Sequence, residues 1–223
     1  MKRITLLILF FYALTSINVF AFCKNHHSEF VLYRNQDSST TTRNTIPAYF
    51  PLTFFKERNS YVGSDTFLVT WYSRQLYALK EPVLFSLKSE NEVYRFTWLR
   101  TFDNPIAIRM EKQDDTYKLY WKVCDGAGGY EPGNLIIDET TDVTEEVWNS
   151  FIKMIKRLDF WDMEPLDSTF DGLDGSQWIL EGKNYYYYRV VDRWSPYGKN
   201  MYSRCCKFLL DLTNLDISED KIY

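Results

Sequence analysis

The segment "TYKLYWKV" (residues 116–123) decides the fold class, because apolar and polar residues alternate along its whole length. One set consists of Tyr117, Leu119, Trp121 and Val123, and the other of Lys118, Tyr120 and Lys122. A period of two residues is typical of a β-strand with one buried face. We therefore expect residues 116–123 to form a half-buried strand.

Several neighbouring segments also have strand character. They are "VLFSLK" (83–88), "VYRFTWLR" (93–100), "PIAIRME" (105–111) and a short segment at 134–138. The connections between successive segments are short and polar, whereas parallel neighbours need a long crossover. The segments therefore predict an antiparallel meander.

A hairpin is predicted near the C-terminal end. "QWILEG" (177–182) and "YYYYRVVDR" (185–193) flank a turn made of Gly182, Lys183 and Asn184, residue types that tolerate turn conformations. Successive strand residues point to opposite faces. On this hairpin the four tyrosines 185–188 would divide into a buried pair and an exposed pair.

Three segments predict helices. Residues 64–81 have apolar residues at helical spacing between a cap at Ser64 or Asp65 and a stop at Pro82, although the start of the segment also fits a strand. Residues 144–158 have Thr144 as a cap, acidic residues in the first turn and basic residues in the last. A final helix is expected over about residues 200–212. Together these elements predict an α+β fold, in which about three helices pack on one face of the antiparallel sheet.

The N-terminal residues predict export. Lys2 and Arg3 precede an apolar stretch, which predicts a signal peptide over residues 1–21, an irregular extension over 22–60 and one α+β domain over 61–223. A transmembrane anchor is the weaker interpretation, because Thr15, Ser16 and Asn18 interrupt the apolar run. We expect a periplasmic or secreted protein, with lipidation at Cys23 as the alternative.

Charge and cysteine content limit the partners. The formal net charge of −4 becomes −6 when Lys2 and Arg3 are removed with the signal peptide, which argues against nucleic acid. The four cysteines match no metal signature, and their disulfide pairing stays open. The only histidines, His26 and His27, lie in the extension, so familiar nucleophilic triads are not expected. No metal or cofactor is predicted.

Two polar segments are candidate sites. "CDGAGGYEPG" (124–133), with Asp125 and Tyr130, is interpreted as a glycine-rich turn rather than a phosphate cradle, since it lacks the lysine and Ser/Thr of a P-loop. Asp167, Thr169, Asp171 and Gly172 imitate the start of a calcium loop, but its twelfth position is Trp178. Solvated loop acids are the simpler interpretation, while Asp174 or Glu181 is the candidate acid or base of a hydrolase.

Aromatic and basic residues of the hairpin complete the candidates. Exposed tyrosines beside tryptophan suit a sugar ring or a protein surface. Arginines within strands are expected to pair with acids across the sheet, with an anion pocket as the alternative. The predicted ligand-contact residues are Trp178, Glu181, Tyr186, Tyr188, Arg193, Trp194, Asp125 and Tyr130.

The order of "YRFTWLRTFDNPIAIR", "GAGGYEPG", "FWDMEP" and "DGLDGSQWILEGKNYYYYRVVDRWSP" resembles a group of exported bacterial proteins of unknown function, over roughly residues 67–215. The resemblance implies a bacterial envelope setting and supplies no site residues. We expect a non-catalytic binding or structural domain that meets an unknown ligand or an envelope protein. A carboxylate-dependent hydrolase of envelope glycans and an inhibitor or immunity-type protein are the alternatives.

Overall fold

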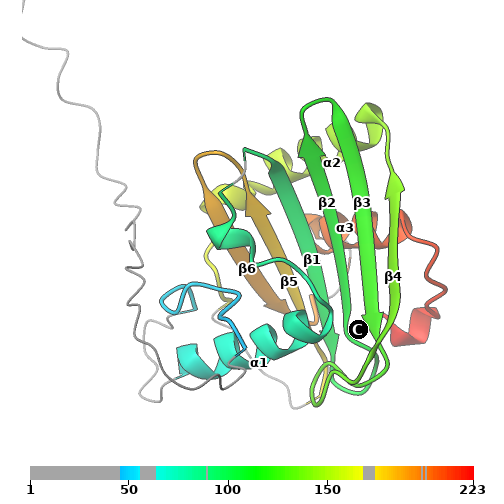
Figure 1. The fold of residues 1–223 in the computed structure, drawn as a ribbon. Helices are drawn as coiled ribbons and strands as arrows, with labels where there is room; N and C mark the ends of the chain where they lie inside the picture. The colour runs from blue at the N-terminus through cyan, green and yellow to red at the C-terminus, as the bar shows by residue number, and fades with distance from the viewer. Residues whose placement is uncertain (1–45, 56–63, 89, 168–173, 197, 199) are drawn as a thin grey trace, which may run out of the picture. The chain divides into compact units, whose positions relative to one another are not determined.

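Six antiparallel strands form one sheet in the computed structural model, which describes residues 46–55, 64–88, 90–167, 174–196, 198 and 200–223 (Figure 1). The strand order is β4-β3-β2-β1-β5-β6. The strands are β1 (Glu92–Arg100), β2 (Ile106–Gln113), β3 (Thr116–Cys124), β4 (Leu135–Asp142), β5 (Ser176–Lys183) and β6 (Tyr188–Trp194). The meander β1 to β4 and the C-terminal hairpin β5–β6 confirm the fold class predicted from the sequence.

The hairpin joins the meander beside β1, so that β1 and β5 are both interior strands of the sheet. Their register places Trp98 opposite Trp178 and Arg95 opposite Glu181. Every residue of β5 is buried, and so is every residue of β1 after Glu92. A strand buried on both sides needs a covering layer on each face of the sheet.

Three α-helices provide these layers: α1 (Ser64–Ala78), α2 (Glu145–Leu158) and α3 (Met201–Asp211). Helix α2 begins where the sequence predicts, because the Thr144 side chain accepts a hydrogen bond from the Val147 N–H. The Asn200 side chain caps α3 in the same way through the Ser203 N–H.

The helices cover both faces of the sheet, and the expectation of a single covered face holds only for α2 and α3. These two pack on the face that carries Phe96, Trp98 and Leu180. Helix α1 packs on the opposite face, against Ile179 and Val190 (Figure 1). The physical reason lies in β5, where the neighbouring residues Ile179 and Leu180 point to opposite faces and are both apolar and fully buried.

Two chain segments differ from the sequence prediction. Residues 46–55 contain no helix or strand, yet Tyr49, Phe50 and Phe55 are buried in the core beneath α1, so this part of the expected extension packs with the domain. The strand predicted at residues 83–88 is wrong, because the segment forms a single 3-10 turn at Leu84–Ser86. Residues 1–45, with the predicted signal peptide and Cys23, lie outside the described residues.

The described helices were also compared with the requirements of a bilayer span. None of them combines the necessary length with sufficient apolar character.

Candidate functional site

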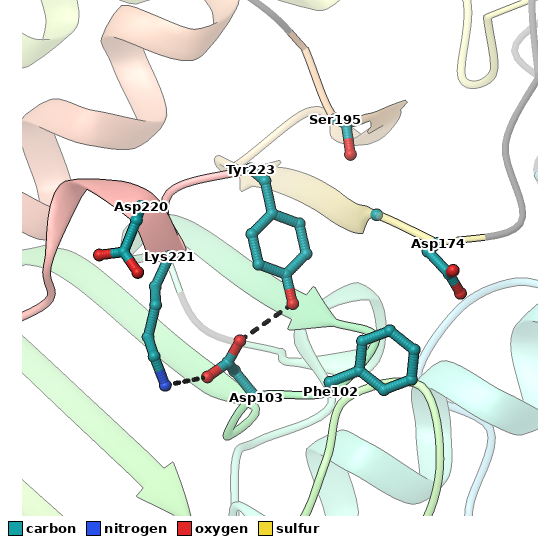
Figure 2. Close-up of a pocket in the computed structure, with 8 residues that line it drawn as sticks. Phe102, Asp103, Asp174, Ser195, Asp220, Lys221 and Tyr223 are labelled. Atoms are coloured by element: carbon teal, nitrogen blue, oxygen red, sulfur yellow. Dashed lines mark hydrogen bonds and ion pairs between the residues drawn. The ribbon is translucent and has the colours of Figure 1, made fainter.

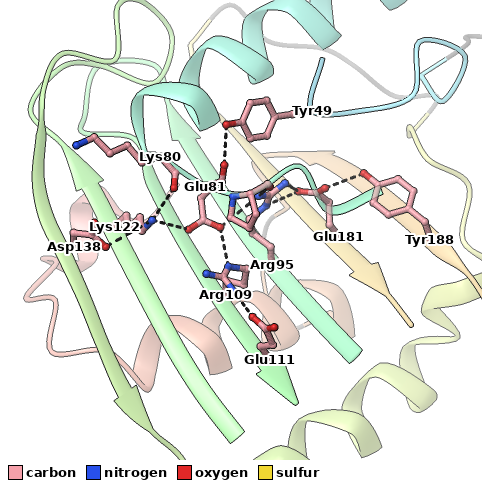
Figure 3. Close-up of polar contacts among 11 residues, drawn as sticks. Tyr49, Lys80, Glu81, Arg95, Arg109, Glu111, Lys122, Asp138, Glu181 and Tyr188 are labelled. Carbon is pink, nitrogen blue, oxygen red and sulfur yellow. Dashed lines mark hydrogen bonds and ion pairs between the residues drawn. The ribbon is translucent and has the colours of Figure 1, made fainter. Parts of the chain in front are cut away.

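A network of buried charges crosses the α1-side face of the sheet (Figure 3). At its centre Glu81, from the loop after α1, contacts three cations from three successive strands. Its carboxylate oxygens lie 3.4 Å from Arg95 Nη1, 3.0 Å from Arg109 Nε and 3.5 Å from Lys122 Nζ. All four of these residues are buried. The network therefore fastens the loop after α1 to β1, β2 and β3.

The network continues in both directions along the sheet. On β5, Glu181 accepts hydrogen bonds from Arg95 Nε at 2.7 Å and from the Tyr188 hydroxyl at 2.8 Å. On β4, Asp138 lies 3.7 Å from Lys122 Nζ, while on β2 Glu111 pairs with Arg109. Because acids and bases alternate along the chain of contacts, each buried charge has a partner of opposite sign.

Glu181 is a member of this network and is fully enclosed. Burial raises the pKa of its carboxyl, against the opposing effects of Arg95 and the Tyr188 hydrogen bond. Two surface hollows lie elsewhere on the protein. One is lined by Phe102 and Asp103, among others, and the second by residues within 77–81 and 133–135, among others. Glu181 lines neither of them. In this structure Glu181 and Tyr188 hold each other inside the protein, and the carboxylate does not face a substrate space.

Trp178 lies in the core between the sheet and α3. Its ring centroid is 5.2 Å from that of Phe96 and 5.3 Å from that of Trp98. Its indole N–H donates to Ser176 Oγ at 2.8 Å and to the Tyr223 backbone oxygen at 3.0 Å. The predicted ligand contact by Trp178 is therefore not available at the surface.

Arg193 and Trp194 also serve the internal structure. The Arg193 guanidinium donates to the backbone oxygens of Glu164 and Pro165 and lies over the Tyr202 ring. Trp194 is half-buried, and its ring lies directly beside Gly175, where an added Cβ would be 2.5 Å from Trp194 Cζ2. Both residues therefore anchor the C-terminal end of β6.

The glycine-rich segment 124–133 is a packed turn, as the sequence indicates. Asp125 Oδ1 closes it by accepting from the Asn134 N–H at 2.6 Å. The Gly128 oxygen accepts from Trp71 Nε1 at 2.9 Å and from Gln75 Nε2 at 3.1 Å, which ties the turn to α1. Tyr130 is exposed and its ring stacks on that of Phe102.

A hollow of about 430 Å³ lies near the same end of the sheet (Figure 2). Phe102, Asp103, Asp174, Ser195 and Lys221 are among the residues that line it. Asp103 accepts from Lys221 Nζ at 2.7 Å and from the Tyr223 hydroxyl at 3.0 Å. Burial alone would raise the pKa of Asp103, but these two hydrogen bonds hold it below its ordinary value. Asp103 is therefore ionised, and its carboxylate already accepts hydrogen bonds from Lys221 and Tyr223 of the same chain.

In the described part of the chain, no three His, Cys, Asp or Glu residues are grouped so that they would hold a metal ion. Thr169, Asp171 and Gly172 of the calcium-like segment lie outside the described residues. Cys124, Cys205 and Cys206 are buried free thiols, and Cys124 lies on the opposite face of the sheet from the other two.

The hairpin tip is the most exposed of the predicted contact regions. Tyr185, Tyr186 and Tyr187 are 65%, 75% and 61% exposed. The prediction that they alternate on a strand is wrong, because β6 begins only at Tyr188. Asn184 Oδ1 accepts from the N–H groups of Tyr186 at 2.9 Å and Tyr187 at 2.8 Å, so the side chain holds the segment as a turn.

The three rings form a continuous aromatic tip. The Tyr185 and Tyr186 centroids lie 4.7 Å apart, those of Tyr186 and Tyr187 lie 6.2 Å apart, and Tyr187 reaches Trp161 at 6.3 Å. We refer to Tyr185, Tyr186 and Tyr187 as the tyrosine tip. It offers a large apolar area with polar hydroxyls, held in place by a defined turn.

Sequence reasoning found part of this arrangement. It predicted that arginines within strands pair with acids across the sheet, which Arg95 and Glu181 do, but it named no specific pair and did not find Glu81 or Lys122 as members of the network. Comparison with protein-family models and with curated proteins gave no match.

Proposed function

We propose that the chain is an exported envelope domain that acts by binding, without catalysing a reaction, and that the tyrosine tip is its contact surface. The observation that carries the proposal is the exposure of three adjacent tyrosines on a turn fixed by Asn184. Exposed aromatic residues are enriched where proteins bind protein surfaces and sugar rings, because they bury large areas with few rotatable bonds.

Several other predicted contact residues make contacts inside the protein, which leaves the tyrosine tip as the favoured contact surface. Glu181 and Tyr188 bond to each other, Trp178 lies in the core and Arg193 bonds to backbone oxygens. A tyrosine side chain loses little conformational entropy when it is immobilised on binding, and the fixed turn lowers this entropic cost further. The export and the bacterial envelope setting rest on the predicted signal peptide and on the resemblance described above.

Thermal unfolding of the full chain tests the proposal. We would measure the midpoint with peptidoglycan fragments, oligosaccharides and divalent metals, for the wild type and for a Tyr185→Ser, Tyr186→Ser, Tyr187→Ser variant. A ligand of the tip should raise the midpoint of the wild type with the logarithm of its concentration and leave the tip variant unchanged. Equal stabilisation of both proteins would contradict the proposal.

Phe67→Ser is the matched control, because Phe67 is 67% exposed on α1 and is not part of the tyrosine tip. It should respond to a ligand of the tip as the wild type does. The hydrolase alternative now depends on Asp174, which lines the hollow of Figure 2. Release of product from a glycan by the wild type, abolished by Asp174→Asn, would replace binding with catalysis.

A further inference from the structure

The outer edge of β4 is an open edge of the sheet. Strand β4 stands at the end of the strand order and pairs with β3. Only Leu135 and Ile137 are half-buried, and its other six residues are exposed. Within the described part of the chain, no backbone hydrogen bond covers the outward groups of this strand, and only the Asp142 oxygen accepts from a side chain, the Thr141 hydroxyl at 3.4 Å.

The opposite edge of the sheet is occupied. There the Asp192 N–H of β6 donates to the Pro165 oxygen at 2.7 Å, and Arg193 donates to Pro165 and to the Glu164 oxygen at 3.0 Å. The chain therefore covers the outward side of β6 at Asp192 with its own backbone. The two edges differ, since β6 has this backbone partner and no backbone partner is described for the outward side of β4.

The register identifies which groups of β4 point outward. The Val143 N–H donates to the Tyr117 oxygen at 3.0 Å, just beyond the end of β4. Because backbone groups alternate in direction along a strand, the N–H groups of Thr141, Glu139 and Ile137 also face β3. The backbone groups of Asp138, Thr140 and Asp142 therefore face away from the sheet and are available to another strand.

The side chains of this edge determine which strand fits. Residues 135–146 contain five carboxylates and no basic residue. They are Asp138, Glu139, Asp142, Glu145 and Glu146, and all five are exposed. Lys122 and Lys118 approach Asp138 and Asp142 at 3.7 Å and 4.0 Å, but only from the β3 side.

A second copy of the chain does not fit this edge. An antiparallel pair of β4 strands centred on Thr140 would set Asp138 of one copy opposite Asp142 of the other. Like charges directly opposite one another destabilise a strand pair. A strand with lysine or arginine at alternate positions would instead meet these carboxylates with opposite charge.

We propose that the β4 edge binds an extended basic segment of a protein partner, which adds to the sheet as a seventh strand. Backbone hydrogen bonds to Asp138, Thr140 and Asp142 would supply the pairing, and the carboxylates would select the basic residues. Strands β3, β2 and β1 separate this edge from the β5–β6 hairpin, so the site is independent of the tyrosine tip.

Fluorescence anisotropy on the full chain tests this proposal with a synthetic peptide in which valine and lysine alternate over about nine residues. Thr140→Pro removes one outward N–H, while Thr140→Val keeps it and serves as the control. We expect saturable binding that weakens with salt, a loss of about tenfold or more in affinity for Thr140→Pro, and an affinity within about twofold of the wild type for Thr140→Val. A peptide of alternating valine and glutamate should not bind.

Hydrogen exchange keeps the test decisive if Thr140→Pro does not fold. In the wild type the peptide should slow amide exchange at Asp138, Thr140 and Asp142. Exchange at these amides unchanged under saturating peptide would overturn strand addition, and so would equal affinity of a folded Thr140→Pro variant or the absence of any binding. Loss of peptide binding in the serine variant of the tyrosine tip would show that the two sites are not independent and would also contradict the proposal.

Discussion

Arg95 on β1 and Glu181 on β5 lie directly opposite each other in the sheet, and their side chains pair at 2.6 Å with no exposure to solvent. Glu81 approaches the same guanidinium from the other side at 3.4 Å. The pair therefore lies between two interior strands of the sheet, where it joins the loop after α1 to the C-terminal hairpin. This position gives Glu181 a structural role.

Removing one partner of this pair should be strongly destabilising. Glu181→Gln leaves Arg95 with the more distant Glu81 alone, and Arg95→Met leaves the buried Glu181 without its cation. Removing one partner of a buried pair costs about 3–5 kcal/mol. Chemical denaturation of the single and double variants measures the effect. We expect the double variant to lose less stability than the two single losses combined, and single losses below about 1 kcal/mol would contradict the structural role.

Asp192 should make stability depend on pH. It is buried, and it accepts a hydrogen bond from the Tyr72 hydroxyl at 2.7 Å. Burial raises the pKa of Asp192 from 3.8 to about 7, although Tyr72 and Arg193 oppose the shift. The folded state therefore holds a proton that the unfolded state has already lost between these two values.

The free energy of unfolding should accordingly be highest near pH 4, fall as the pH rises towards 7, and level off above that. The fall attributable to Asp192 is on the order of 4 kcal/mol at most. Denaturation of the wild type and of Asp192→Asn between pH 4 and 8 measures it by difference. The same pH slope in both proteins would show that Asp192 is not the group responsible.

Gly128 should not tolerate a side chain. A Cβ at this position would lie 2.7 Å from the backbone nitrogen and oxygen of Arg100, which cannot rotate away. Gly128→Ala should therefore destabilise the protein by about 1–3 kcal/mol, as forced overpacking does elsewhere. Thermal unfolding checks this expectation, and an unchanged midpoint would mean that the turn does not pack as closely as described.

The tyrosine tip and Trp178 should respond to substitution in opposite ways. Serine at Tyr185, Tyr186 and Tyr187 should change stability by no more than about 0.5 kcal/mol at each position, because the rings are exposed. Trp178→Ala should cost about 3–5 kcal/mol, because it empties a buried site. Chemical denaturation compares them, and a large loss for the tip variant would show that the rings stabilise the fold.

Local patterns were sufficient to predict most of the fold. The alternation at residues 116–123 predicts β3, and Thr144 with its acidic and basic neighbours predicts α2 to within one residue. The turn of the hairpin was placed too early, because Asn184 directs the chain through its side chain rather than through a left-handed backbone at Gly182. Helix α1 covers the second face of the sheet because β5 is buried on both of its faces. The sequence pattern of β5 did not reveal this burial on both faces.

The charge network was harder to predict, because its central residue, Glu81, is the last residue of the segment predicted as a helix, whereas α1 ends at Ala78. Glu81 reaches the sheet from a loop, and the spacing of residues along the chain carries no information about a contact between a loop and three strands. Arg95 and Glu181 were recognisable as partners because both lie within strands, where oppositely charged residues pair across the sheet. The sequence predicted one exposed pair among tyrosines 185–188, whereas the exposure of all three residues of the tyrosine tip depends on the turn and was found only in the structure.

Photo-crosslinking at the tyrosine tip tests the proposed function most directly. A photoreactive benzoylphenylalanine replaces Tyr186 in one full-length protein and Phe67 in another, since both side chains are well exposed. After irradiation with envelope material, we predict adducts at position 186 that disappear when Tyr185 and Tyr187 are serine, and no comparable adducts at position 67. Equal adducts at both positions, or none at position 186, would contradict binding through the tip.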